Sequence, residues 1–260
     1  MNILQLIKDE LKIDFTSTII EFDSGSGSEN PFELSARDFL RFAKSDFKSN
    51  DKKGNINALT NAKRAIDCQI DSAFTMFGIQ YDKIPNSSNK IIELTGLMNL
   101  DLPHKLKLIQ AVDFAPSGLI SKTRTLRNKL EHYYKIPDKE EVRDAIELAE
   151  LFVLSIESHI KIIEDSFSIT DKSKHDESHY INNCVKVDFN YELKEINLGF
   201  YNEKEKIETI TLNQNDEVFY AFIKLINNIH EQIELEDSLK IFLKMIEHPI
   251  PEKNIRLELI

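Results

Sequence analysis

Residues 59–77 read LTNAKRAIDCQIDSAFTMF, and their apolar side chains recur mostly at steps of three and four residues. The apolar positions are Leu59, Ala62, Ile66, Ile70, Ala73, Phe74 and Phe77. Because an α-helix makes one turn in about 3.6 residues, these side chains share one face, and the stretch predicts an amphipathic helix. Gly78 stands where helices commonly end in a left-handed residue, so we expect the helix to end there.

Similar patterns surround this helix. Further helices are predicted over about residues 35–47, 103–116, 119–136 and 138–163. Ser35 with Asp38, and later Asp138, suit helix starts because their side-chain oxygens can accept hydrogen bonds from free backbone N–H groups. Pro137 ends the fourth helix. Residues 50–55, which are polar and include Gly54, are expected to be a connection. About five helices in 165 residues predict a helical bundle.

The C-terminal third has a different period. Val185, Val187 and Phe189 alternate with polar residues, as in a half-buried strand, and similar strands are expected near residues 196–200 and 207–212. Short polar connections between them favour an antiparallel meander. Two helices, over about residues 216–229 and 237–247, and a last strand at 255–260 complete the pattern.

The expected fold class is therefore mainly α, with a small α+β domain after the bundle. The bundle would cover residues 1–167, with an N-terminal extension over 1–34 that contains a short amphipathic helix and a flexible loop at 23–28. Residues 168–180 are expected to be a linker. Residues 181–260 would form the α+β domain with its antiparallel sheet.

Composition limits the classes of function. The chain is 41% hydrophobic and 30% charged, and its net charge of −11 argues against nonspecific coating of nucleic acid. From His104 to Lys135, however, seven cations face two acids, which gives +5 and leaves −16 for the rest. No apolar run approaches the roughly 20 residues that span a bilayer. Cys68 and Cys184 are expected to be reduced core thiols, and we expect a cytoplasmic protein with no membrane partner.

The basic segment contains the sequence Arg127-Asn128-Lys129-Leu130-Glu131-His132, followed by Tyr133 and Tyr134. On a helix, Asn128 and His132 share a face. An arginine fork suits two phosphate oxygens, and an imidazole moves protons near neutral pH. Together they meet the minimum for metal-free RNA cleavage, in which the imidazole takes the proton of the ribose 2′-OH that attacks phosphorus.

This arrangement resembles the HEPN superfamily, whose hallmark is an arginine, often followed by a polar residue, with a histidine four to six residues later. The resemblance covers roughly residues 35–165 and includes the helix that contains Asn61–Asp67. It implies a metal-independent endoribonuclease without cofactor, found in toxin–antitoxin, antiviral or RNA-processing settings. Arg127, His132 and Asn128 would be its catalytic residues, and Arg124, Lys129, Tyr133 and Tyr134 would bind the RNA. It also implies a homodimer through the bundle and allows for an inhibitory protein partner.

Other readings of the same residues remain open. Arg127 can pair with Glu131 at i,i+4 spacing, and His132 can favour a helix C-terminus as an imidazolium. The chain would then be a non-catalytic helical interaction module, or a protein that binds RNA or a nucleotide without turnover. His175 and His179 are spaced like a metal pair but lack the order of known zinc helices, so no metal site is expected.

Overall fold

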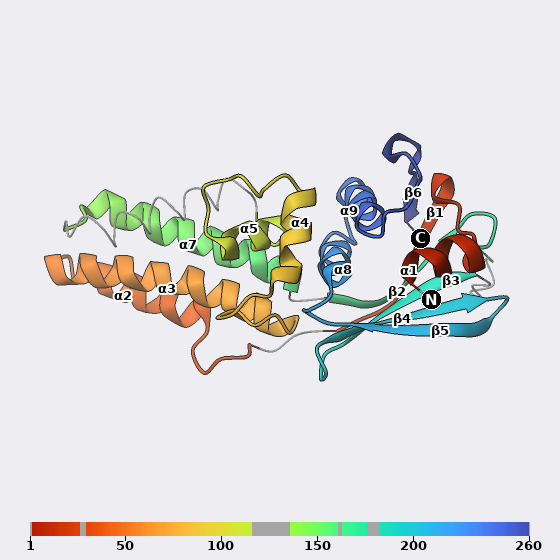
Figure 1. The fold of residues 1–260 in the computed structure, drawn as a ribbon. Helices are drawn as coiled ribbons and strands as arrows, with labels where there is room; N and C mark the ends of the chain where they lie inside the picture. Colours follow the sequence, from red (N-terminus) through yellow and green to blue (C-terminus); the bar gives the residue numbers. More distant parts are fainter. Residues whose placement is uncertain (1, 27–29, 116–135, 161–162, 176–182, 260) are drawn as a thin grey trace. The chain divides into compact units, whose positions relative to one another are not determined.

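A computed structural model describes residues 2–26, 30–115, 136–160, 163–175 and 183–259 (Figure 1). These residues form two units. The sheet unit contains residues 1–27, 77–100 and 162–260, and the helical unit contains residues 28–76 and 101–161. Because a six-stranded sheet forms much of the first unit, the protein is α+β, and the expectation of a mainly α fold was wrong.

The helical unit is built on the predicted helices. They are α2 Ala36–Lys48, α3 Lys52–Met76, α5 His104–Ala111 and α7 Lys139–Ile160. Ser35 and Asp38 form a reciprocal capping box at the start of α2, with the Ser35 N–H donating to Asp38 Oδ2 at 2.9 Å. Asp138 likewise accepts from the Glu141 N–H at 2.8 Å at the start of α7. Both predicted starts are confirmed, because each side chain satisfies a backbone group that the helix leaves free.

The expected connection at residues 50–55 was wrong, since α3 already begins at Lys52. The Asp51 side chain accepts from the Gly54 N–H at 2.7 Å and so supplies the helix with its first cap. A Cβ atom on Gly54 would lie 2.5 Å from the carbonyl oxygen of Asp46. The glycine therefore permits the tight turn between α2 and α3 instead of marking a loop.

The sheet has the strand order β5-β4-β3-β2-β1-β6. The strands are β1 Thr18–Ser26, β2 Ile163–Asp171, β3 Cys184–Asn190, β4 Glu195–Asn202, β5 Glu205–Leu212 and β6 Leu257–Leu259. Neighbours are antiparallel except β1 and β6, which are parallel. The predicted meander of β3, β4 and β5 and the predicted last strand are confirmed.

Two strands lie where none was expected. Residues 23–26, expected to be a flexible loop, form the second half of β1, and the expected linker at 168–180 begins inside β2. The two strands pair with each other, from Thr18 opposite Asp171 to Ser26 opposite Ile163. A neighbouring strand supplies the hydrogen bonds that a glycine- and serine-rich segment needs to remain extended, so pairing outweighs the low strand propensity of the segment.

Helices cover one face of the sheet. They are α1 Ile3–Gln5 with the π-helical turn Leu6–Leu11, α8 Glu217–Asn227 and α9 Gln232–Met245, and α4 Asn89–Leu94 packs on α8 and α9. Short 3-10 turns lie at Phe15–Ser17, Asn86–Ser88 and Glu252–Asn254. In Figure 1, α1, α8 and α9 lie on the same side of the sheet. Phe167, Val187 and Leu198 are fully buried, and Phe222 of α8 packs on Phe242 of α9 with ring centroids 4.9 Å apart.

The two cysteines differ in environment. Both are free thiols, and burial raises the pKa of Cys184 to about 12. Cys68 is only half-buried and donates to the Leu34 carbonyl at 3.4 Å, so the expectation that it belongs to the core was wrong. Among the described residues, no helix has both the length and the apolarity that crossing a membrane requires.

Gly78 ends α3 as predicted, in the left-handed region at φ +76°. A Cβ atom there would lie 2.4 Å from Lys194 Cβ and 3.0 Å from the Lys194 carbonyl oxygen. We expect Gly78→Ala to lower the free energy of unfolding by about 3 kcal/mol, because backbone strain and overpacking add. Urea unfolding measures this loss.

Gly96 provides a matched control. It has nearly the same φ, +75°, but a Cβ atom at Gly96 would meet nothing within 4 Å. Gly96→Ala should therefore lower the free energy of unfolding only through the strain of its left-handed backbone, by about 1 kcal/mol. Equal losses in the two variants would mean that the approach of Lys194 contributes nothing.

Candidate functional site

The residues that the sequence singles out for RNA chemistry share one segment. They are Arg124, Arg127, Asn128, Lys129, His132, Tyr133 and Tyr134. All of them lie in residues 116–135, outside the described residues. The candidate catalytic site therefore remains a prediction from the sequence, and the described chain provides the elements on either side of it.

Both flanks of the segment belong to the helical unit. Before it, α5 ends at Ala111, and the chain turns through Asp113 at φ +59°. After it, residues 136–138 are not helical, as Pro137 predicts, and α7 begins at Lys139. Pro137 also accepts a hydrogen bond of 3.5 Å from Asn55 Nδ2 near the start of α3, which holds the starts of α3 and α7 together.

The polar side of α3 contacts α5. Asp71 of α3 forms an ion pair with Lys105 of α5. Next to Lys105, burial and then the charge of Lys107 lower the pKa of His104. Both effects favour the neutral form of the His104 imidazole.

A ladder of ion pairs joins α2 to α7. Arg37 binds Glu157 through a fork in which Nε lies 2.8 Å and 3.0 Å from the two carboxylate oxygens. Lys44 binds Glu150 at 2.7 Å. Both members of the second pair lie seven residues from those of the first, or about two helical turns, so the ladder fixes α2 and α7 antiparallel.

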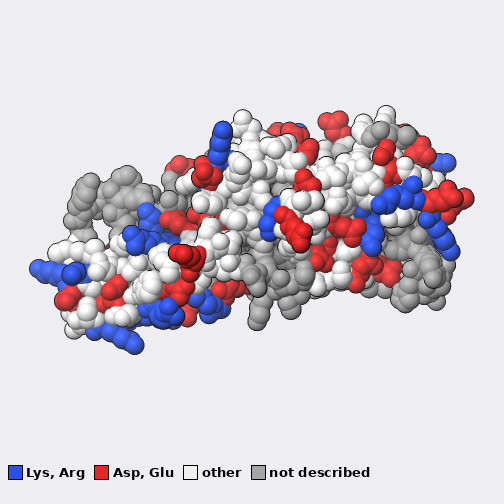
Figure 2. Space-filling model, turned by 90° about the horizontal axis from the view of Figure 1, so that it is seen from below, with Lys and Arg blue, Asp and Glu red and all other residues white. Residues whose placement is uncertain are grey.

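The sheet carries polar side chains on the face away from α8. Lys186 Nζ lies 3.2 Å from Asp23 and 3.9 Å from Asp188, and Ser166 donates to Asp188 at 2.7 Å. Burial lowers the pKa of Lys186, but the two carboxylates outweigh it and raise the pKa overall. The single ammonium compensates about half of the charge of these two carboxylates. Figure 2 likewise shows groups of both signs interspersed.

A histidine and a carboxylate meet at one edge of this polar face. His175 Nε2 lies 3.3 Å from Glu21 Oε2, and both side chains are largely buried. The structure thus joins His175 to β1, whereas its sequence partner His179 lies outside the described residues. Among the described residues, no three His, Cys, Asp or Glu side chains gather as metal ligands would.

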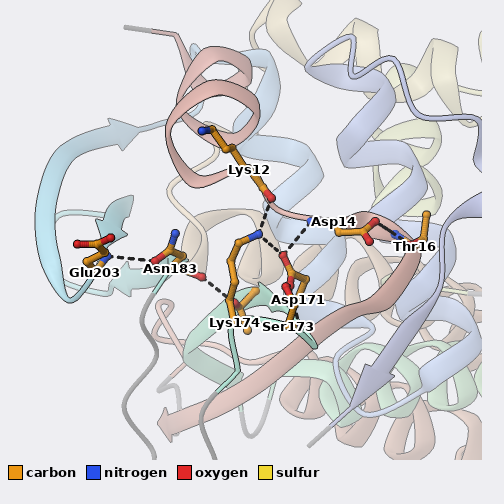
Figure 3. A network of polar contacts seen from close by, with 9 residues as sticks. Lys12, Asp14, Thr16, Asp171, Ser173, Lys174, Asn183 and Glu203 are labelled. Carbon is orange, nitrogen blue, oxygen red and sulfur yellow. Dashed lines mark hydrogen bonds and ion pairs between the residues drawn. The ribbon is translucent and has the colours of Figure 1, made fainter.

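Asp171 is the centre of a network that the sequence did not reveal (Figure 3). Its carboxylate is fully buried and accepts from the Asp14 N–H and the Ser173 N–H, each at 2.9 Å. It also accepts from the Ser173 hydroxyl and from Lys174 Nζ, and that ammonium reaches the Lys12 carbonyl. Two of these contacts, from the Asp14 N–H to Asp171 and from Lys174 to the Lys12 carbonyl, join the N-terminal segment to the end of β2, so the network holds the two segments together instead of presenting a reactive group.

A signal for this network is present in the sequence. Asp171-Lys172-Ser173 has the Asp-x-Ser order that forms a turn around a side-chain oxygen. Thr170 extends the network by donating to the Asn183 carbonyl at 2.6 Å, and the Asn183 side chain accepts from the Glu203 N–H at 3.1 Å. The turn signal lay in the segment that was expected to be a linker.

Comparison with known proteins found no matching family model, no matching curated protein and no matching solved structure.

Proposed function

We propose that this chain is a metal-independent endoribonuclease of the HEPN type. One observation carries the proposal: Arg127, Asn128 and His132 have the hallmark spacing and directly precede α7 in a unit whose described elements are helices. The +5 charge of residues 104–135 in a chain of −11 also favours a phosphate ligand there.

Each residue has a defined role in the proposed mechanism. His132 takes the proton of a ribose 2′-OH, whose oxygen attacks the adjacent phosphorus, and a protonated group returns a proton to the departing 5′-oxygen. Arg127 stabilises the charge on the phosphoryl oxygens. Asn128 orients the histidine or the RNA. The products are a 2′,3′-cyclic phosphate and a 5′-hydroxyl end.

Secondary contacts complete the proposed site. Arg124 and Lys129 add positive charge close to the phosphate, and Tyr133 and Tyr134 offer rings on which bases stack. We further propose that two copies of the chain associate through the helical unit, and that an inhibitory protein restrains the activity in a toxin–antitoxin or antiviral setting. The two free thiols agree with a reducing cytoplasm as the location.

The test uses the full chain and a labelled single-stranded RNA in the presence of EDTA. We expect cleavage that leaves cyclic phosphate ends. A single 2′-deoxy substitution should abolish cleavage at the linkage next to the substituted sugar, because that sugar lacks the attacking hydroxyl. Intact RNA in this assay, together with unimpaired growth of cells that express the chain, would instead support the non-catalytic interaction module. Cleavage that requires a divalent metal would contradict the proposed mechanism.

A further inference from the structure

One side of α2 carries a cation at nearly every turn. The cationic ridge consists of Arg37, Arg41, Lys44 and Lys48 on α2 and of Lys52 and Lys53 at the start of α3. The four positions on α2 are spaced by four, three and four residues, which places them on one face over about 16 Å. The side chains of Arg37, Arg41 and Lys44 are 60%, 72% and 47% exposed.

The acids within the ridge are engaged in holding the fold. Asp38 caps α2 and also forms an ion pair with Arg41 at 2.7 Å. Asp46 accepts a hydrogen bond from Asn61 Nδ2 at 2.9 Å, and Asp51 caps α3. On α7, Glu157 forms an ion pair with Arg37, and Glu150 forms one with Lys44. Within the described part of the chain, Lys48, Lys52 and Lys53 form no ion pair and are exposed. The end of the ridge therefore holds three exposed cations that form no ion pair among the described residues, and they outnumber the two neighbouring carboxylates, Asp46 and Asp51, which accept hydrogen bonds from neutral groups.

An aromatic side chain lies beside one cation of the ridge, Arg41. Phe42 is 37% exposed, and the Arg41 guanidinium lies 5.8 Å from the centre of its ring. Phe39 supports the ring from one edge, with centroids 6.2 Å apart and planes at 89°. An accessible ring beside cations is the combination on which unpaired bases stack while phosphates follow the positive charges.

We propose that the cationic ridge and Phe42 bind single-stranded RNA. Charge complementarity selects a phosphodiester backbone, and the accessible ring selects unpaired bases over a duplex, whose bases are stacked on one another. The proposal rests on the proposed function in its choice of RNA as the ligand. It adds a binding surface on α2 and α3, separate from Arg127 and His132 in sequence.

The experiment measures binding of a fluorescein-labelled 2′-O-methyl oligouridylate of about 16 nucleotides, a length that a single-strand site can cover. This probe cannot be cleaved through its 2′-oxygen. In the variant Lys48→Gln/Lys52→Gln/Lys53→Gln, the slope of log K against log salt should fall by about 2, since each lost phosphate contact contributes about 0.7. The matched variant Lys8→Gln/Lys83→Gln/Lys253→Gln changes the same charge on exposed lysines of the sheet unit and should keep the parent slope.

Phe42→Leu tests the aromatic part separately. It retains an apolar contact for Phe39 but removes the ring face, so affinity should fall about tenfold with an unchanged salt slope. Ile233→Ala is the control, since Ile233 is 77% exposed on α9. Thermal unfolding of every variant shows whether the fold is retained.

The results separate this surface from the nuclease proposal. The proposal that the ridge binds single-stranded RNA is contradicted if the probe does not bind the parent or if the ridge variant binds it like the control variant. It is also contradicted if a duplex of the same chemistry competes equally well. Each of these results leaves RNA cleavage to be judged by its own assay. Binding that depends on the ridge without any RNA cleavage would support the surface and contradict the nuclease.

Discussion

Replacing His132 by alanine is expected to slow RNA cleavage about 10²- to 10⁴-fold, the usual contribution of a positioned general acid or base. Arg127→Ala should cost about 10²- to 10³-fold, because charge on the phosphoryl oxygens would lose its fixed donor. Initial rates on a labelled RNA measure both losses. Binding of the uncleavable probe should change far less than the rate, since the lost interactions act mainly in the transition state.

Two comparisons separate chemistry from folding. Arg127→Lys retains the charge but loses the planar fork, so it should keep the pH dependence of the parent at a reduced rate. His132→Ala should instead lose the limb of the pH profile that titrates near neutral pH. His230→Ala, on an exposed histidine of the sheet unit, should leave the rate unchanged. Parental rates in His132→Ala would remove this residue from the mechanism.

Local patterns predicted the helices well, for a physical reason. The period of residues 59–77 reflects one buried face of α3, and the Ser35–Asp38 and Asp138–Glu141 boxes satisfy backbone groups within three residues. Such signals depend only on neighbours in the chain. Gly78 could be placed for the same reason, because its left-handed conformation ends the helix locally.

The sheet was underestimated because its pairing is not local. β1 is held by β2 and β6, which come from distant parts of the chain, and its residues 23–26 have the composition of a loop. A strand stabilised by partners so far away leaves little trace in its own period. The same holds for Asp171, whose partner Asp14 lies 157 residues earlier. The candidate site at Arg127 and His132 is the opposite case, since a local motif predicts it and its residues lie outside those described.

Asp171→Ala should destabilise the protein strongly, by about 3–5 kcal/mol, the usual loss when one partner of a buried ion pair is removed. The fully buried carboxylate accepts from the Asp14 and Ser173 amides, and Lys174, only 21% exposed, would lose its counter-charge. The free energy of unfolding in urea at pH 7 measures the effect. Asp171→Asn should lose less, because the amide retains one acceptor and nearly the same volume.

Asp237 provides a matched control for Asp171. It pairs with Lys240 at the same i,i+3 spacing, at 2.8 Å, but is 66% exposed. Because an exposed pair is screened by water, Asp237→Ala should cost less than about 1 kcal/mol. Similar losses in the two variants would show that burial adds nothing at Asp171, and that the N-terminal segment is held by its apolar contacts alone.

The stability that Asp171 contributes should also depend on pH, in a direction that follows from its pKa. Burial raises the pKa of Asp171, but hydrogen bonds from Lys174, Ser173 and the Asp14 amide outweigh it and hold the pKa below its ordinary value. The carboxylate therefore contributes its full stability above about pH 4, the pKa in the unfolded chain, and loses it as the pH falls toward the lower folded value. The gap in unfolding free energy between the parent and Asp171→Asn should be constant near neutral pH and narrow below about pH 4. A gap that widened on acidification would mean that the folded protein binds the protonated carboxyl more favourably, which four converging donors do not allow.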